Sequence, residues 1–174
     1  MILARYVDAD PAALSFEYSA KGKPSLAEPK HDVHFNVSHS GDLALVAVAA
    51  DRAVGIDVER ERHIGDALDV ARRFYSPSES ELLEAVPAEH RDQAFLTLWT
   101  RKEACLKVLG SGLSVDPAAV NVAAPPDVDV SGVTDKTTDE FLRRIQVHDL
   151  HVQPGYLAAI AAQGKDWSVN VRTL

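Results

Sequence analysis

Two acidic residues placed two positions apart, Asp57 and Glu59, lie in the otherwise mostly apolar segment Val54 to Arg60. Because side chains alternate between the two faces of a β-strand, the three aliphatic residues of this segment share one face, and Gly55, Asp57 and Glu59 share the other. Two like charges on one face repel each other, and burying them without a partner costs free energy. The segment therefore predicts a strand whose acidic face contacts something positive.

A divalent cation is one candidate for that positive group. Magnesium prefers oxygen ligands, and it usually keeps water or phosphate oxygens in its coordination shell. The alternative is a polar strand face that Arg60, Arg62 or water neutralises. The acidic pair alone does not separate these two interpretations, because short acidic pairs are common.

Composition limits the class of protein. The chain has 174 residues, enough for one domain with a real core, and its 46% hydrophobic and 25% charged residues are ordinary for a soluble globular protein. Its longest apolar run, Leu43 to Ala50, is too short to span a membrane, and the N-terminus lacks the form of a secretory signal. A single cysteine, Cys105, favours a cytoplasmic location. The net charge of −8 argues against nucleic acid as a partner.

Apolar patterns and turn residues indicate strands, then helices, then strands, which is typical of an α+β fold. A short strand over 34–37 should end at a polar turn over 38–41. The continuous apolar run at 43–49 and the strand at 53–59 are expected to pair as an antiparallel hairpin around Asp51 and Arg52. At the other end of the chain, three segments resemble a closing meander of strands: 143–152, 156–162 and 167–171.

Three helices are expected between these strands, at 65–74, from Ser76 to about 85, and at 88–109. Ser76 is a suitable N-cap for the second helix, and Glu79 stands where a capping box needs a glutamate. Gly110 is placed to end the third helix. Residues 114–135 hold three prolines and several aspartates, so we expect a loop there.

The third helix carries Trp99, Glu103 and Lys107 four residues apart, which places them on one stripe. An aromatic, an acid and a base in register could belong to a site. They could equally be surface decoration, since a Glu–Lys pair at this spacing adds only about 0.2–0.5 kcal/mol. Trp99 fits a packing anchor better than a ligand contact, and Cys105 points away from the stripe toward the core.

Taken together, these segments resemble the 4'-phosphopantetheinyl transferase superfamily, and specifically its larger, monomeric surfactin-synthetase-activator (Sfp) type. The resemblance implies a fold of two pseudo-symmetric α/β lobes within one domain, with lobe one at about 1–75 and lobe two at about 76–174. It rests on two signature segments, VGIDVER at 54–60 and LWTRKEACLKVLGSGL at 98–113, and on four further ones: GKPSL at 22–26, FNVSHSG at 35–41, RRFYSPSESELL at 72–83 and PGYLAAIAA at 154–162.

The resemblance implies a transfer reaction. Members of this family move the 4'-phosphopantetheine arm of coenzyme A onto a serine of an apo acyl or peptidyl carrier protein and release adenosine 3',5'-bisphosphate. Magnesium is the implied metal, and manganese accepts the same ligands. Two alternatives stay open: a non-catalytic relative that binds coenzyme A or a carrier, and the smaller trimeric holo-carrier-protein synthases, whose metal acids lie nearer the N-terminus. The carrier and its pathway, whether fatty acid, polyketide or nonribosomal peptide synthesis, are not written in the sequence.

The family motifs also imply roles for individual residues. Asp57, Glu59 and Glu103 match the metal-binding acids, and Glu103 is the implied general base. Lys107 matches the lysine that contacts phosphate or the incoming serine, which makes it both a catalytic and a cofactor-binding candidate.

The remaining candidates lie earlier in the chain. Ser38 and His39 match residues that touch the diphosphate, and His39 is also a catalytic candidate. Lys23 matches a residue near the nucleotide. Glu79 is ambiguous, because the family places it near the site while the sequence also fits it to a capping box. Lys102 could pair with an acid or with the ligand.

The region before Lys23 is shorter than the family pattern leads one to expect, with only 22 residues. The first lobe is therefore expected to be truncated. A monomer is expected, although a shortened lobe could expose apolar surface and promote self-association. Carrier proteins tend to be acidic, and a basic docking patch could include four arginines: Arg60, Arg62, Arg72 and Arg73.

Overall fold

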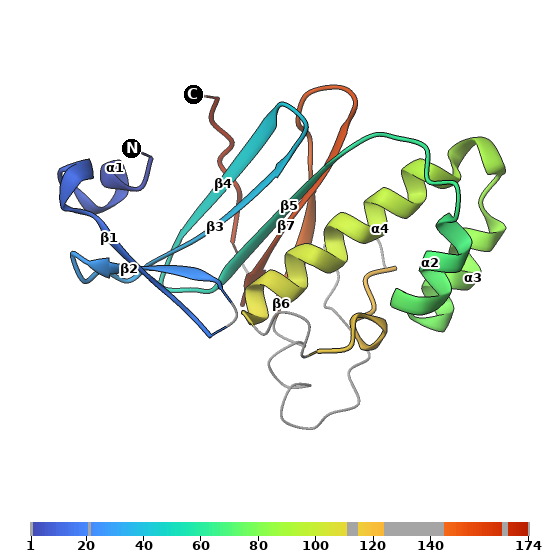
Figure 1. Ribbon diagram of the computed structural model, residues 1–174, viewed down its shortest axis with the longest axis horizontal. Coiled ribbons are helices and arrows are strands. Elements are labelled where there is room, and N and C mark those ends of the chain that lie inside the picture. The colour runs from blue at the N-terminus through green and yellow to red at the C-terminus, as the bar shows by residue number, and fades with distance from the viewer. Residues whose placement is uncertain (1, 21, 111–114, 124–144, 165–166, 174) are drawn as a thin grey trace.

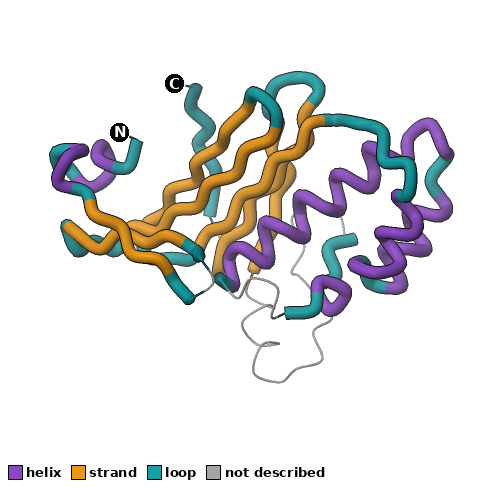
Figure 2. The backbone as a smooth tube through the Cα atoms, viewed as in Figure 1, coloured by secondary structure: helices purple, strands orange, loops and turns teal. Residues whose placement is uncertain are grey.

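The structure, a computed structural model, describes residues 2–20, 22–110, 115–123, 145–164 and 167–173 (Figure 1). Strands form the middle of the molecule, with a long helix beside them, shorter helices at one end and short helical turns near the N-terminus at the other end (Figure 2). In chain order the elements are α1 (Ala4–Val7), η1 (Pro11–Ala13), β1 (Ser15–Tyr18), β2 (Pro24–Glu28), β3 (Val33–Ser40), β4 (Leu43–Ala50), β5 (Val54–Arg60), α2 (Ala67–Phe74), α3 (Pro77–Ala85), α4 (Ala88–Leu109), η3 (Pro117–Ala119), β6 (Ile145–Leu150) and β7 (Tyr156–Gln163).

A three-stranded antiparallel sheet of order β5-β7-β6 carries the acidic strand. Asp57 pairs with Ala159 and Gly55 with Ala161 across the β5–β7 ladder. Ala159 and Ala161 are fully buried in the main core, which also contains the apolar residues of α4. The shared acidic face that the sequence predicts for β5 is therefore the face that α4 covers.

Gly55 allows α4 to lie unusually close to this sheet. A Cβ atom at position 55 would stand 2.1 Å from the carbonyl oxygen of Ala104 and 2.8 Å from the amide nitrogen of Val108. Real side chains do not tolerate such distances, so only glycine permits this contact. The glycine in the signature segment thus sets the distance between β5 and α4.

β4 packs against the opposite face of the sheet, while side chains of β3 bind along the edge of β5. A second, smaller core joins Ala47 of β4 to Val54 and Ile56 of β5 and to Ile160 of β7. Two expectations about this region are wrong. β3 continues through Ser40 instead of turning at 38–41, and β4 pairs with β3 while β5 pairs with β7.

The polar residues Ser38 and Ser40 resemble turn residues but belong to the strand, because their side chains bind the amides of β5. The tight turn lies at Gly41 and Asp42, where Gly41 has φ +55°, a conformation that suits glycine. The pattern of β4 is continuously apolar, so it favours no partner strand over another.

All three predicted helices are present. α3 begins with the predicted capping box, in which Ser76 and Glu79 exchange side-chain to backbone hydrogen bonds. α4 ends at Gly110, which is left-handed with φ +60°. Within the described ranges, no helix combines the length and the apolar character that crossing a bilayer would require.

The C-terminal meander is only partly confirmed. β6 and β7 form as predicted, but residues 167–171 form no strand. Trp167 instead packs edge-on against His148 of β6, with ring centroids 4.4 Å apart, and most of the residues after it are exposed. Packing of the Trp167 side chain, and not backbone pairing between strands, therefore holds this segment against β6. Residues 124–135 of the predicted loop lie outside the described residues, and 117–119 form a short 3₁₀ turn.

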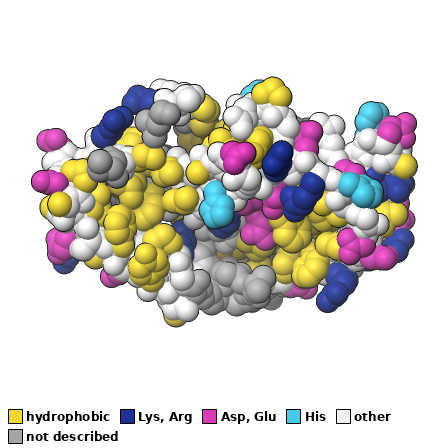
Figure 3. All heavy atoms as spheres, turned by 45° about the horizontal axis from the view of Figure 1, so that its top comes forward, with side chains coloured by type: hydrophobic (Ala, Val, Ile, Leu, Met, Phe, Trp, Pro, Cys, Tyr) yellow, Lys and Arg dark blue, Asp and Glu magenta, His cyan; other side chains and the backbone are white. Residues whose placement is uncertain are grey.

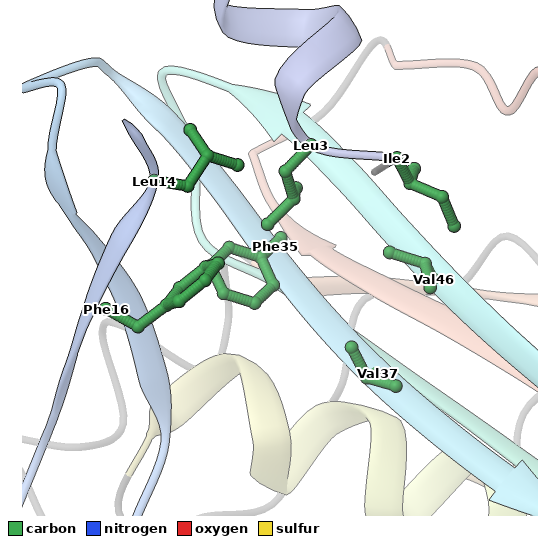
Figure 4. Close-up of a pocket in the computed structure, with 7 residues that line it drawn as sticks. All are labelled: Ile2, Leu3, Leu14, Phe16, Phe35, Val37 and Val46. Carbon is green, nitrogen blue, oxygen red and sulfur yellow. The ribbon is translucent and has the colours of Figure 1, made fainter. Parts of the chain in front are cut away.

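The N-terminal elements cover part of the outer face of the β3–β4 hairpin. β1 and β2 form an antiparallel pair, and Phe16 of β1 contacts Phe35 of β3 edge-on at 5.8 Å. An apolar hollow of about 270 Å³ remains beside this contact (Figure 4). Hydrophobic side chains gather at this end of the molecule, whereas charges of both signs lie over its middle (Figure 3). The hollow is lined by Ile2, Leu3, Leu14, Phe16, Phe35, Val37 and Val46.

The predicted boundary between two lobes at residue 75 remains a prediction, as does the truncation of the first lobe. β5 lies on the first-lobe side of that boundary, yet its hydrogen-bonded partner β7 lies on the other side.

Candidate active site

The acidic strand and the third predicted helix meet at Asp57 and Lys107. The Lys107 ammonium donates to Asp57 Oδ1 at 2.7 Å, to the Ile56 carbonyl at 3.0 Å and to Ser38 Oγ at 3.3 Å. These bonds use all three of its N–H donors. The close approach permitted by Gly55 brings the two together, because the Cβ of Lys107 would lie 3.0 Å from a Cβ on that glycine.

The two oxygens of Asp57 have unequal surroundings. Oδ1 accepts hydrogen bonds from Lys107 and from Ser38 Oγ at 2.9 Å. Oδ2 is buried and has no hydrogen-bond partner among the described residues. Burial raises the pKa of Asp57 above its ordinary value, while Lys107 and Ser38 oppose that rise and Glu59 adds to it. A buried carboxylate oxygen without a partner costs free energy unless a ligand contacts it.

Glu103 contributes a second carboxylate from α4. Burial is the main reason that its pKa is raised, and the negative charge of Asp57 is the next. Glu59 also raises the pKa, whereas Lys107 lowers it. The acids predicted from strand and helix are therefore near enough to act on one another's charge.

Glu59 lies at the outer end of the same strand face. Its Oε2 accepts from Arg62 at 2.7 Å and from Ser40 Oγ at 3.2 Å. The positive groups that the sequence required are thus Lys107 for Asp57 and Arg62 for Glu59. Arg62 is one of the arginines that the alternative interpretation named.

The residues present fit a hard divalent cation in chemistry. Asp57, Glu59 and Glu103 supply only oxygen donors, and Asp57 Oδ2 is a buried oxygen without a partner among the described residues. As they stand, no three acidic, histidine or cysteine side chains in the described part of the chain are grouped closely enough to hold a metal ion. The metal assignment therefore stays a prediction that rests on the type and location of the donors.

Lys23 lies at the junction of α4 and β5. Its Nζ donates to the Lys107 carbonyl at 2.5 Å and, more distantly, to the Val54 carbonyl at 3.4 Å. Burial lowers its pKa. A cation at these carbonyls also complements the negative end of the helix dipole. The structure thus shows Lys23 bound to the backbone of the site, and its predicted contact with nucleotide remains untested.

Ser38 and His39 point to opposite sides of β3. Ser38 is buried and faces Asp57, whereas His39 is exposed. His39 shares its strand face with Phe35 and Val37, which line the apolar hollow. The structure brings Ser38 into the acidic site and leaves His39 on the other face of the strand, so the ligand contact predicted for His39 finds no support in this geometry.

A family model described as the 4'-phosphopantetheinyl transferase superfamily matches residues 53–161, which is more than half of the chain. The chain belongs to this family. The matched span begins just before β5 and ends within β7, so it contains Asp57, Glu59, Glu103 and Lys107.

Curated members of the transferase family are similar to the chain in sequence. HetI of Nostoc sp. (strain PCC 7120) is 41% identical over 115 residues, which cover 65% of this chain and 48% of HetI. A transferase of Bacillus subtilis is 38% identical over 123 residues, covering 70% of this chain and 53% of its own length. Sfp of Bacillus subtilis strain 168 is 29% identical over 171 residues, covering 98% and 72% respectively. The chain spans about half the length of the first two of these relatives.

A solved structure shares the fold. The holo-[acyl-carrier-protein] synthase of Thermotoga maritima aligns with a TM-score of 0.51 and 22% identity, covering 66% of this chain and 64% of that one. At this level of identity the likeness concerns the fold alone. Together with the matching family model, it confirms an α+β fold of the phosphopantetheinyl transferase kind.

Glu79, whose role the transferase motifs left open, belongs to a separate buried cluster. It is fully buried and accepts from Lys102 Nζ at 2.8 Å, from the Val122 amide at 2.7 Å and from the Ser76 amide at 2.7 Å. Lys102 also donates to the Pro117 carbonyl at 2.8 Å. Both oxygens of Glu79 accept hydrogen bonds, so this side chain joins α3 and Val122 to α4.

Trp99 is a packing residue, as the sequence predicts. Its ring stacks on Phe95 at 6.0 Å and meets Phe74 edge-on at 6.3 Å. Cys105 is fully buried in the main core, and burial raises the pKa of its thiol to about 12. Sequence reasoning missed Ser40, although it stands in the same FNVSHSG segment and shares the strand face of Ser38.

Proposed function

We propose that this chain transfers the 4'-phosphopantetheine arm of coenzyme A to a serine of an apo acyl or peptidyl carrier protein. The observation that carries the proposal is the meeting of Asp57 with Lys107, beside Glu103, inside the span that the transferase family model matches. In the reaction the serine oxygen bonds to the phosphorus on the pantetheine side. The bond from that phosphorus to the bridging oxygen breaks, and adenosine 3',5'-bisphosphate leaves with the electron pair.

Magnesium or manganese would be held by Asp57, Glu59 and Glu103. When bound, it would neutralise the diphosphate and the charge that develops on the leaving phosphate. The buried Oδ2 of Asp57, which has no partner among the residues that the structure describes, supports this role, because burial without a ligand leaves that oxygen unsatisfied.

Glu103 is the proposed general base, which takes the proton of the attacking serine hydroxyl. A base works best when its pKa lies near the working pH. In the absence of a metal, burial and the neighbouring Asp57 raise the pKa of Glu103 toward that range. A bound cation would lower this pKa again, so Glu103 is proposed to act on the serine either directly or through a water molecule.

Lys107 is proposed to stabilise negative charge on the transferring phosphate. Its ammonium is already held at the acidic site by three hydrogen bonds. Contact with a phosphate oxygen would exchange one of these bonds for a charge-assisted bond of comparable or greater strength.

The carrier is proposed to dock where basic side chains lie beside the acids. Arg62 and Arg60 continue from the end of β5, and Arg62 contacts Glu59 directly. Arg72 lies farther along the chain in α2, where it pairs with Asp69 and Glu84. Docking at the end of β5 would bring an acidic carrier next to Glu103. We also propose a cytoplasmic location for the protein.

The direct test is to incubate the protein with magnesium, coenzyme A and an apo carrier protein, and to follow the carrier by intact-mass spectrometry. The proposal expects the carrier to gain the mass of one phosphopantetheine arm, and expects a chelator to prevent the gain. If coenzyme A or the carrier binds but the carrier's mass stays unchanged, the chain is a non-catalytic binding relative and the transferase proposal is wrong.

A further inference from the structure

Three alternate side chains of β3 bind the free edge of β5. The two residues of each bonded pair are 20 positions apart in the sequence, so β3 runs parallel to β5. Side-chain oxygens of β3 take the place of backbone carbonyls along this seam, the line of contact between β3 and β5. The bonds satisfy amides that would otherwise face an open sheet edge. They run from the amides of Ile56, Val58 and Arg60 to Asn36 Oδ1, Ser38 Oγ and Ser40 Oγ, at 2.9, 3.3 and 3.0 Å.

Two of these three side chains also donate to the acids of the candidate site. Ser38 Oγ donates to Asp57 Oδ1 at 2.9 Å, and Ser40 Oγ donates to Glu59 Oε2 at 3.2 Å. A hydroxyl has one hydrogen to donate and two lone pairs that accept. In each serine, one lone pair accepts a β5 amide, which leaves the hydroxyl hydrogen free to point elsewhere. It points to the carboxylate of the β5 residue that precedes that amide.

Ser38 has no hydrogen-bonding capacity left. Its hydrogen goes to Asp57, and its lone pairs accept from the Val58 amide and from Lys107 Nζ at 3.3 Å. An anionic ligand would need a donor, and this hydroxyl could offer one only by releasing Asp57. Its geometry therefore favours contact with the acid over contact with a diphosphate.

We propose that Ser38 and Ser40 are positioning residues, which hold Asp57 and Glu59 in the direction needed to bind a divalent cation. The proposal rests on the metal site of the proposed function. Ser38 then has a role different from the ligand contact that the family resemblance implies, and Ser40 has a role that the family motifs do not assign. Outer hydrogen-bond partners of metal ligands typically change metal affinity about 10–100-fold when removed.

Asn36 provides a matched control within the same seam. Its side chain binds the Ile56 amide just as the serines bind theirs, but the preceding residue of β5 is Gly55, which has no carboxylate. Removing Asn36 therefore disturbs the contact between the strands without removing a partner of either acid.

The experiment measures the Mn²⁺ dissociation constant by electron paramagnetic resonance, together with amide hydrogen exchange, without substrate. We expect Ser38→Ala and Ser40→Ala to weaken Mn²⁺ binding about 10–100-fold. Asn36→Ala should expose the Ile56 amide to exchange and leave Mn²⁺ affinity unchanged. Ser40→Thr keeps a hydroxyl and should keep the wild-type affinity.

Other outcomes would overturn the proposal. If both serine variants bind Mn²⁺ as tightly as wild type, or if Asn36→Ala weakens binding equally, the hydroxyls only join two strands. If the wild-type protein itself binds no Mn²⁺, the metal site of the proposed function fails as well. Should Ser38→Ala not fold, the half-buried Ser40, with its alanine and threonine variants, decides the matter alone.

Discussion

At the scale of single residues, the described part of the chain holds Asp57 through one of its two carboxylate oxygens. Lys107 and Ser38 bind Oδ1, while Oδ2 is buried without a partner among the described residues. An amide of the same shape would keep much of the packing and lose the charge. A loss of activity in Asp57→Asn would therefore report the role of the carboxylate and not the integrity of the fold.

We expect Asp57→Asn and Glu103→Gln each to lower the rate of arm transfer by about 10²-fold or more, because each removes charge that acts on the reacting groups. Initial rates by mass spectrometry, with circular dichroism to check the fold, provide the measurement. Ser25→Ala is a suitable control, since it removes an exposed serine–glutamate hydrogen bond in the β1–β2 hairpin. Near-native rates for both acid variants would refute the assigned roles.

Glu103 should also make stability depend on pH. Its pKa is raised above the ordinary value of 4.5, mainly by burial and next by Asp57. The folded state then holds the proton more tightly than the unfolded chain, so stability falls as pH rises from 4.5 through the raised pKa.

Glu103→Gln removes this loss of stability. In thermal unfolding with a chelator present, the variant should be more stable than wild type at neutral pH, and the difference should vanish below pH 4.5. A variant that is less stable than wild type at neutral pH would show that the charged carboxylate is well compensated.

At the scale of secondary-structure elements, the contact between α4 and β5 depends on Gly55. Adding a methyl group there would force α4 away from the strand, because the new atom would lie 2.1 Å from a backbone oxygen. We expect Gly55→Ala to lower the free energy of unfolding by about 2 kcal/mol or more in a urea titration. Gly65→Ala is the control, since its new atom would lie no closer than 4.0 Å to a neighbour. Equal stability of the two variants would contradict the close approach.

The buried pair of Glu79 and Lys102 holds α3 and α4 together. Lys102→Met would leave the Glu79 carboxylate buried without its charge partner, which typically costs about 3–5 kcal/mol. The double variant Glu79→Gln/Lys102→Met should lose less stability than the two single variants added together. Arg72→Ala, which breaks two exposed ion pairs, should change stability little. Additive losses in the double variant would mean that the two groups act independently.

Local signals in the sequence predict the helices well. The capping box at Ser76 marks the start of α3, and the glycine at position 110 marks the end of α4. Both boundaries lie where these residues indicate. Strand pairing has no such local signal. The run Leu43–Ala50 is apolar throughout, so its sequence does not reveal that β3 is its partner. Trp167 is typical of a strand by residue type, but it packs against His148 instead, and that contact depends on the tertiary fold.

At the scale of the whole molecule, the site unites β3, β5 and α4, with Lys23 from the N-terminal hairpin at the end of that helix. Motifs could predict Asp57 and Lys107, because the family spacing marks both. They could not predict that Ser40 contacts Glu59 or that Lys23 binds the Lys107 carbonyl, since those contacts depend on how strands far apart in sequence are placed. The monomer expected from the sequence stays a prediction, as does its alternative, self-association through apolar surface. Phe16 and Val37, beside the apolar hollow, are exposed apolar residues that could take part in such a contact.

We propose that Asp57, Glu59 and Glu103 share one divalent cation that holds the diphosphate of coenzyme A. Anomalous diffraction from a crystal grown with Mn²⁺ and coenzyme A tests it most directly. We expect one strong peak about 2 Å from Asp57 Oδ2 and in contact with diphosphate oxygens, with Glu59 and Glu103 bound directly or through water. A peak elsewhere, or a diphosphate bound with no metal near these carboxylates, would contradict it.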